Sequence, residues 1–413
     1  MLKSLDFNKI NGYLLLFFTF AFPLSRAIAS IFMVYFALYF VVALLKRDYP
    51  KDFFKNRLVA VLLIFIFYVL LSNLWNGISN DFFGKGYLQW FAIFGIAIYL
   101  YKNPTYIYKM ITAFIFGMLV SEILSYGMYF NLWKINGKGS AHPTPFMMHL
   151  MYSVFLAVTS ILLLNRILSK QYTLKEKILL SIFFITVTGN LLISNGRTGQ
   201  VGFIAAILVV FLLHFRNPIK ALFISISLIA ILFFSGYYTL TNFKNRVDNT
   251  VYNIKSIFNH NYKTSWGRRV GMWLVTGDLV KEKPIFGHGI GGVNKATIKL
   301  FKQKDFGFSK GTKDFISTHH LHNQYLQTIS EDGIVGLILL FLIYYYILRL
   351  DIKDRELKQF SILFVIIYIF SSFGDPLLIK QFTRVLFIVF VGIFLGSYLK
   401  ERNEIINCNI DKE

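Results

Sequence analysis

The segment AIASIFMVYFALYFVVALL, residues 27–45, decides the fold class of this chain. It contains no charged side chain, and Lys46 and Arg47 follow it at once. A helix of this length crosses about 28 Å, close to the ~30 Å hydrocarbon core of a bilayer. The apolar run is continuous rather than alternating, which favours a membrane helix over a barrel strand.

Similar apolar blocks recur through the 413 residues, which are 55% hydrophobic with a mean hydropathy of +0.55. Only 15% are charged, against roughly 25% in soluble domains. The sequence therefore predicts an all-α integral membrane protein with about twelve transmembrane helices. Spans one to nine fall in 1–238, a large, mainly helical outer loop in 239–332, spans ten to twelve in 333–399, and a cytoplasmic tail in 400–413. The predicted spans are 10–25, 27–45, 58–75, 86–101, 110–129, 146–164, 178–195, 199–213, 221–238, 333–348, 360–374 and 382–399.

The net charge of +22 is better explained by membrane topology than by nucleic-acid binding. With the N-terminus inside, the inner segments carry 22 Lys and Arg residues, whereas the short outer loops and outer helix ends carry seven. The long loop is left out of this comparison because its length exempts it from the positive-inside rule. We therefore expect both termini in the cytoplasm. The single cysteine, Cys408, excludes a disulfide framework.

This topology gathers the histidines on the outer side of the membrane. The loop ends in His319-His320-Leu321-His322-Asn323, close to the point where the chain re-enters the membrane. Histidine titrates near neutral pH and is therefore a common proton-transfer group. A transport path would instead place polar residues near the midplane, so we expect a reactive site at the outer leaflet. The outer histidines are His142, His149, His260, His288, His319, His320 and His322.

Residues 194–200, Ser-Asn-Gly-Arg-Thr-Gly-Gln, form a predicted tight turn between spans seven and eight. Its glycines, Gly196 and Gly199, allow the turn and a close approach of the backbone. The turn would present Arg197, whose guanidinium is a fork of donors suited to phosphate oxygens. An interfacial arginine that reaches toward lipid headgroups is the alternative interpretation.

The long loop contains a predicted amphipathic helix over 265–282, ended by Pro284. Arg269 and Trp273 are four residues apart and therefore share a face of this helix. A cation beside an aromatic ring suits a phosphate next to a sugar. A helix resting on anionic headgroups, with Trp266 and Trp273 as anchors, fits the same pattern equally well.

Three other features receive less weight. The glycine pattern at 287–292 resembles a dinucleotide-binding loop, but no strand precedes it, so we expect a turn between two loop helices. His320 and His322 lack an acidic or cysteine cluster with metal-ligand spacing, so we expect acid–base use and no metal or other cofactor. Glu122 is the only acid inside a predicted span, and we expect it to neutralise an arginine on the outer side.

The order of these motifs resembles that of the O-antigen ligases. A late outer loop is combined with Gly-Arg-Thr-Gly at 196–199, Arg-x-x-x-Trp at 269–273, Pro-x-x-Gly-x-Gly at 284–289 and His-x-His-Asn-x-x-Leu at 320–326. The same superfamily holds O-antigen polymerases and protein O-oligosaccharyltransferases. Each motif is short, but their order and their common outer placement make the set fairly specific.

The resemblance implies transfer of a glycan from undecaprenyl diphosphate to a sugar hydroxyl of lipid A–core, at the periplasmic face of the bacterial inner membrane. It implies a glycosyltransferase that inverts the anomeric carbon without a nucleotide sugar, metal or cofactor. Arg197 and Arg269 would clamp the two phosphates, and His322 would take the proton of the attacking hydroxyl. The expected partners are this donor, this acceptor and membrane lipids. Supporting substrate-binding roles fall to Arg268, Trp273, His320, Asn323 and Asp375, of which Asp375 or Asn323 would orient the imidazole.

Several alternatives share parts of this pattern. An O-antigen polymerase uses the same donor but takes another lipid-linked glycan as its acceptor, and a protein O-oligosaccharyltransferase takes a Ser or Thr of an exported protein. A transporter of lipid-linked glycans is the non-enzyme alternative. It predicts a charged cavity through the membrane, whereas the predicted spans hold few charges near the midplane.

Overall fold

The computed structural model describes residues 7–75, 85–259 and 261–410, so the predicted position of His260 lies outside the described residues. Within these ranges the regular elements are all helices, and an isolated bridge joins Ile135 to Lys138. The elements are α1 (Phe7–Ala21), α2 (Arg26–Leu45), η1 (Phe53–Lys55), α3 (Arg57–Trp75), η2 (Tyr87–Phe91), α5 (Ala92–Lys102), α6 (Tyr106–Tyr129), α7 (His149–Leu168), α8 (Leu174–Ile193), α9 (Arg197–His214), α10 (Pro218–Thr239), α11 (Thr241–Phe258), α12 (Ser265–Glu282), α13 (Gly292–Gln303), α14 (Lys310–Thr318), α15 (Gln324–Leu348), α16 (Arg355–Ser371) and α17 (Gln381–Ile410).

A helix overlaps each of the twelve predicted spans. In the described part of the chain, eight of these helices are both long and apolar enough to cross a membrane, and Lys9–Ala21 and Arg57–Ser72 form shorter apolar helices. α5 and α16 are 11 and 17 residues long. The all-α, multi-pass character is therefore confirmed, whereas the number of twelve crossings stays a prediction.

The helix α17 lies at the centre of the bundle, with every residue from 382 to 397 buried. It packs along α5, which in turn packs along α2. Small residues permit this close approach: a Cβ at Gly95 would lie 2.0 Å from the carbonyl oxygen of Phe36, and one at Gly392 would lie 2.8 Å from the side chain of Ile96. Glycine is therefore required where these three helices cross.

The helix α15 begins nine residues before the predicted span, and Gly333 breaks it with a φ of 65°. The segment after α12 docks on this break: the N–H of His288 donates to the carbonyl of Ser330 at 2.8 Å, and the N–H of Ile334 donates to that of Pro284 at 2.9 Å. These bonds satisfy backbone groups that the kink removes from the helix ladder. The glycine-rich stretch is thus a turn between α12 and α13, as predicted.

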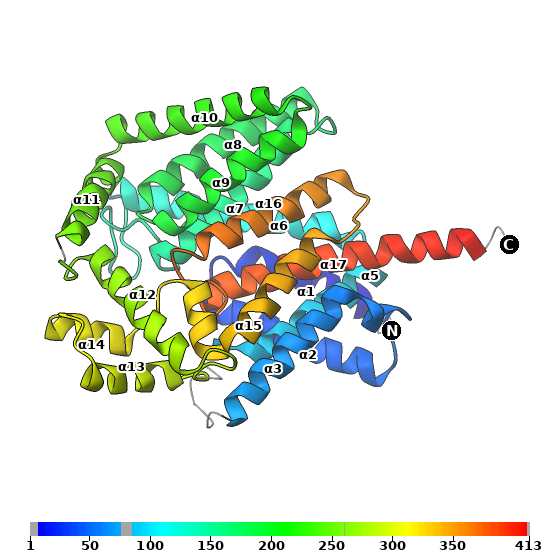
Figure 1. The fold of residues 1–413 in the computed structure, drawn as a ribbon. Coiled ribbons are helices and arrows are strands. Elements are labelled where there is room, and N and C mark those ends of the chain that lie inside the picture. The colour runs from blue at the N-terminus through cyan, green and yellow to red at the C-terminus, as the bar shows by residue number, and fades with distance from the viewer. Residues whose placement is uncertain (1–6, 76–84, 260, 411–413) are drawn as a thin grey trace.

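The predicted loop helix over 265–282 is confirmed as α12, with the same bounds. Thr264 caps it by accepting a hydrogen bond from the N–H of Gly267 at 3.1 Å. Together with α13 and α14 it encloses a small apolar core of its own. In Figure 1, α11 to α14 lie at one end of the bundle, and both chain termini lie toward the other.

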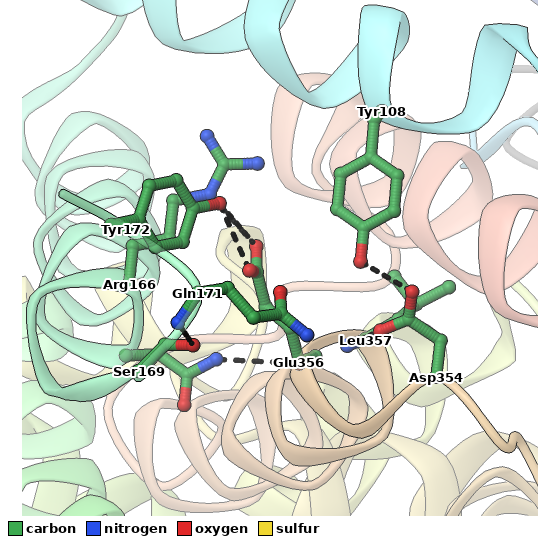
Figure 2. A network of polar contacts seen from close by, with 9 residues as sticks. Tyr108, Arg166, Ser169, Gln171, Tyr172, Asp354, Glu356 and Leu357 are labelled. Carbon is green, nitrogen blue, oxygen red and sulfur yellow. Dashed lines mark hydrogen bonds and ion pairs between the residues drawn. The ribbon is translucent and has the colours of Figure 1, made fainter. Parts of the chain in front are cut away.

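The segments predicted to lie on the inner side contact one another at the end near the termini. Arg166 pairs with Glu356 at 2.9 Å, the hydroxyl of Tyr172 donates to the same carboxylate, and that of Tyr108 donates to Asp354 (Figure 2). Arg166 and Glu356 are both buried. This network joins the ends of α6, α7 and α16, which agrees with the predicted sidedness of these segments.

Candidate functional site

A histidine pair and an aspartate meet where α15 begins. The Nδ1 atom of His322 lies 3.1 Å from Oδ1 of Asp375, and Nε2 of His320 lies 3.2 Å from the same oxygen. The two imidazole centres are 4.5 Å apart. Asp375, on the turn between α16 and α17, is 0% exposed. The sequence indicated these three residues, and the fold brings them together.

The first turn of α15 hydrogen-bonds to both segments that form this contact: the histidine segment before α15 and the turn between α16 and α17. The N–H of Leu321, between the two histidines, donates to Oε1 of Gln327 at 2.8 Å. In the second segment, the N–H of Leu378 donates to Oε1 of Gln324 at 2.9 Å, and the N–H of Gln324 donates to the carbonyl of Ser372 at 2.8 Å. The two loops are therefore fixed relative to one another through a single helix end.

The backbone at His322 is itself unusual. Its φ is 48°, in the left-handed region that non-glycine residues seldom adopt. Asn323 follows as the N-cap of α15, and its Oδ1 accepts hydrogen bonds from the N–H groups of Tyr325 and Leu326. This oxygen is thus used for capping, and Asp375, not Asn323, contacts the imidazole of His322. Backbone strain at one residue beside a cap is typical of functional sites.

The charges around Asp375 keep its carboxylate ionised. Burial alone would raise the pKa of Asp375, but hydrogen bonds from His320 and His322 and the charges of His320 and Lys380 outweigh it, so that this pKa lies well below its usual range. Burial lowers the pKa of His320, Asp375 opposes this shift, and Lys380 and His322 add to it. The site therefore favours a neutral His320 beside an anionic Asp375.

The contact also corrects the sequence-based argument that His320 and His322 lack an acidic partner for a metal ion. The ligand atoms of His320, His322 and Asp375 all lie within 4.8 Å of one another, so these residues form a group that is able to hold a metal ion. Sequence spacing did not reveal this group because Asp375 lies 53 residues from His322 in the chain. The three side chains suit either a metal or a hydrogen-bonded imidazole.

The turn that carries Arg197 is as tight as predicted, although Asn195, not a glycine, adopts the positive φ of 61°. The glycines serve close packing instead. A Cβ at Gly199 would lie 2.0 Å from the carbonyl oxygen of Ser153, and the N–H of Gly199 donates to Oγ of Ser153 at 3.0 Å. Arg197 is the first residue of α9, where the helix dipole adds to its positive charge.

The N-termini of α9 and α12 meet through an aromatic contact. The guanidinium of Arg197 lies 5.9 Å from the ring centre of Trp266, in the first turn of α12. In the next turn of α12, burial lowers the pKa of Arg269, Asp375 opposes this shift, and Arg246 adds to it. Arg269 is therefore within electrostatic range of both the carboxylate and a second arginine.

Arg246, on α11, completes this cluster and was not indicated by the sequence. Burial lowers its pKa, and its Nε atom is buried without a hydrogen-bond partner. Among the described residues, Arg197, Arg246 and Arg269 form no ion pair. Cations left unpaired beside one another repel, so an anionic ligand would stabilise the cluster. A half-buried arginine on an otherwise polar loop helix leaves no motif in the sequence.

An apolar groove opens beside these arginines. It has a volume of about 280 Å³ and runs between α8, α9, α10 and α11, and it is called here the α9–α11 groove. Arg197, Arg246 and Trp266 line it together with aliphatic and phenylalanine side chains. A charged mouth on an apolar channel suits an amphiphile whose head is anionic and whose tail is hydrocarbon. The lining side chains are Leu191, Leu192, Arg197, Gln200, Val201, Phe203, Ile204, Ile207, Ile229, Leu232, Phe233, Phe243, Arg246, Val247, Thr250 and Trp266.

The remaining predicted residues lie at the edge of the site. Arg268 stacks over the ring of Phe315 at 4.8 Å, and Phe315 in turn stacks on His319 and lies parallel to His322. Trp273 is 39% exposed, and in the described part of the chain no cation–π contact joins it to an arginine. Trp266, an interface anchor under one of the two interpretations of α12, is the aromatic residue that faces Arg197.

These features define a multi-pass helical membrane protein with an arginine-rich cleft, an adjoining apolar groove and a histidine–aspartate contact. A family model described as O-antigen ligase matches residues 182–341, which supports membership of the O-antigen ligase superfamily. Members of this superfamily are ligases and polymerases of the glycosyltransferase type, which favours an enzyme over a transporter. Arg197, Arg269 and His322 lie inside the matched region, and Asp375 lies beyond it.

A relative from Haemophilus influenzae, described as an uncharacterized protein, is 31% identical over 242 residues. The match covers 55% of this chain and 58% of the relative. It supports descent from a common ancestor over this part of the chain and assigns no activity.

Proposed function

We propose that the protein is an O-antigen ligase, a metal-independent inverting glycosyltransferase that moves a glycan from undecaprenyl diphosphate to lipid A–core. The observation that carries the proposal is the juxtaposition of three parts: unpaired arginines, an apolar groove that they border, and His322 hydrogen-bonded to Asp375. The proposed setting is the periplasmic face of the inner membrane, with both termini in the cytoplasm.

The cleft suits a polyprenyl diphosphate donor. Arg197 and Arg246 at the mouth of the α9–α11 groove, with Arg269 close by, offer several donors to diphosphate oxygens. The N-termini of α9 and α12 add partial positive charge at the same place. The prenyl tail would lie along the leucine, isoleucine and phenylalanine side chains of the groove. This arrangement stabilises negative charge on the leaving diphosphate, the part a metal ion plays in many other enzymes.

The His322–Asp375 contact suits proton abstraction. If Nδ1–H donates to the Asp375 carboxylate, Nε2 keeps its lone pair and is free to accept a proton. The acceptor hydroxyl oxygen would then attack the anomeric carbon while its proton passes to Nε2. The bond from that carbon to the diphosphate oxygen breaks, and the electron pair leaves with the diphosphate. A single displacement inverts the configuration at the anomeric carbon.

The proposal is tested by transfer assays with purified protein in proteoliposomes that hold undecaprenyl-diphosphate glycan. The acceptor is offered as lipid A–core in one set and as a second undecaprenyl-diphosphate glycan in the other. We expect product on lipid A–core with wild type, and no product with His322→Ala. His319→Ala is the matched control, because His319 is exposed and does not contact Asp375.

The other outcomes of these assays point to a different acceptor or to a different base. Product only on the second polyprenyl-linked glycan assigns the chain to the polymerases. Activity retained in His322→Ala removes the base assignment. Lipopolysaccharide profiles of a ligase-null host, complemented with the same variants, extend the test to cells.

A further inference from the structure

A second apolar cavity lies between α6 and α8, with a volume of about 780 Å³. Phe183 and Thr186 of α8 face it, whereas Leu191 and Leu192 face the α9–α11 groove. Helical spacing places these two sets on different faces of α8. Two separate apolar grooves therefore lie on either side of one helix. The second is called here the α6–α8 groove.

Glu122 is the feature that distinguishes the α6–α8 groove from an ordinary lipid-facing surface. Its side chain lines the groove and is 2% exposed. Thr186 hydrogen-bonds to the carboxyl group, but the Oε2 atom of Glu122 is buried without a hydrogen-bond partner. The expected pairing with an outer arginine is wrong: no ion pair of Glu122 exists among the described residues. Arg166, at the far end of the groove, is paired with Glu356 instead.

A carboxyl oxygen that is buried in an apolar medium without a hydrogen-bond partner destabilises the folded state. A plain hydrocarbon chain in the groove leaves this destabilisation in place. A carboxylate oxygen accepts hydrogen bonds, so the occupant that suits it brings a donor into the apolar region. Hydroxyl groups and amide N–H groups on an acyl chain are such donors. Polyprenyl chains and simple ester-linked acyl chains carry none.

The predicted outer end of the α6–α8 groove lies toward the turn that carries Arg197. Trp133 closes this end, with its indole seated on Gly127 and its Nε1 donating to the carbonyl of Leu124 at 3.0 Å. The segment that carries Trp133 continues to Ala141, whose carbonyl accepts from Nδ2 of Asn195 at 2.8 Å. Asn195 belongs to the Arg197 turn. A lipid head at the end of this groove therefore lies beside the loop that borders the arginine cluster.

We propose that the α6–α8 groove holds an acyl chain of the lipid acceptor, and that Glu122 recognises a hydroxyl or amide N–H on that chain. This inference rests on the proposed function, because it assigns the second lipid substrate of the same reaction. The donor and acceptor lipids would then approach the cleft from opposite sides of α8. Selection between them would follow from chemistry: a prenyl chain has no group to offer Glu122, and a hydroxyacyl chain has one.

Photo-crosslinking in nanodiscs tests the inference without requiring turnover. p-Benzoylphenylalanine replaces Ile182 in the wall of the groove, or Ile226 of α10 as the matched control, which is equally exposed to lipid and lies outside both grooves. The probes are lipid A with 3-hydroxyacyl chains, dimyristoyl phosphatidylethanolamine and undecaprenyl phosphate. We expect position 182 to label hydroxyacyl lipid A about fivefold more than the phospholipid, in line with one additional hydrogen bond.

The variants Glu122→Leu and Glu122→Gln separate recognition from folding. In Glu122→Leu the preference at position 182 should fall to near one, whereas Glu122→Gln, which keeps a carbonyl acceptor, should retain part of it. Equal labelling at 182 and 226, a preference for undecaprenyl phosphate, or a preference unchanged in Glu122→Leu overturns the inference. Labelling as expected together with no transfer to lipid A–core refutes the proposed function while keeping the groove as a site for hydroxyacyl lipids.

Discussion

His322 and Asp375 are 53 residues apart in the chain, and 3.1 Å separates Nδ1 of the imidazole from Oδ1 of the carboxylate. The contact joins the end of the loop segment before α15 to the turn between α16 and α17. It fixes which imidazole nitrogen faces the buried acid and leaves the other for a substrate. Asp375 is ionised because hydrogen bonds and nearby charge outweigh its burial.

The first prediction concerns this pair. His322→Ala should lower kcat about 10²–10⁴-fold, the usual contribution of a general base. Asp375→Asn should lower kcat at least about tenfold, because an amide does not fix the tautomer of His322 as the carboxylate does. Donor binding, measured by titration of undecaprenyl diphosphate, should change little in either variant. A loss of donor affinity equal to the loss of kcat would show that the pair holds the donor rather than the proton.

The second prediction concerns Arg246, which structure alone brought to the site. Arg246→Ala should weaken diphosphate binding as much as Arg197→Ala does, and Arg246→Lys should recover part of the affinity, since a single ammonium replaces a fork of donors. Isothermal titration with undecaprenyl diphosphate measures both. Lys244→Ala on the same helix is the control, because Lys244 is exposed and outside the groove. Equal affinity in the Arg246→Ala and Lys244→Ala proteins contradicts the clamp.

The third prediction addresses the possible metal group. Because the proposed mechanism places charge stabilisation on arginines, chelation by EDTA should leave transfer unchanged, and added Zn²⁺ should not raise it. The measurement is the initial rate in proteoliposomes after dialysis, with metal content determined on the same sample. If the chelated protein is inactive and Zn²⁺ restores it, the group of His320, His322 and Asp375 is a metal site and His322 is not the base.

The fourth prediction follows from the lowered pKa of His320, which burial causes and Asp375 partly opposes. Since the folded state binds this proton less readily than the unfolded state, the unfolding free energy should fall as pH drops below about 6.5. His320→Gln removes this contribution, so its Tm should fall less between pH 7.5 and pH 5 than that of wild type. His319→Gln, remote from Asp375, should follow wild type. The same slope in all three proteins contradicts the assignment.

Much of the fold followed from local patterns. Continuous apolar blocks located the helices, and the stretch from Ser265 to Glu282 was predicted to the residue because a cap precedes it and a proline follows it. Helix length was less predictable: α5 is short, and α15 begins before its apolar stretch because Gly333 allows a kink that other contacts hold. Such contacts join segments far apart in the chain, and composition does not record them.

In the candidate site, too, the sequence predicted residues that lie in local motifs and missed those that long-range contacts bring in. Arg197, Arg269 and His322 lie in recognisable motifs, so the sequence indicated them. Arg246 has no motif, and it became visible only when α11 packed beside the α9–α11 groove. Asn323 was expected to bind substrate, but its side chain caps α15. A motif thus indicates a candidate residue, whereas the role of its side chain depends on contacts that only the fold provides.

The last prediction concerns Gln327, which touches neither proposed substrate. Its Oε1 accepts from the N–H of Leu321 at 2.8 Å, its Nε2 donates to Glu331 at 2.6 Å, and Glu331 pairs with Lys85. This chain anchors the backbone between the two histidines to a buried ion pair. Gln327→Met keeps the size of the side chain and removes the acceptor, so the imidazole of His322 should lose its fixed distance to Asp375.

We expect Gln327→Met to lower kcat about tenfold with unchanged affinity for undecaprenyl diphosphate, because a small misplacement of a catalytic group affects the reaction more than binding. Transfer rates and donor titration on the same preparation measure the two effects, and Gln303→Met on the exposed end of α13 is the control. A merely structural role would lower the Tm and the donor affinity together. If kcat stays at the wild-type value, the hydrogen bond from Leu321 does not position His322, and the hydrogen bonds of Gln324 alone hold the site.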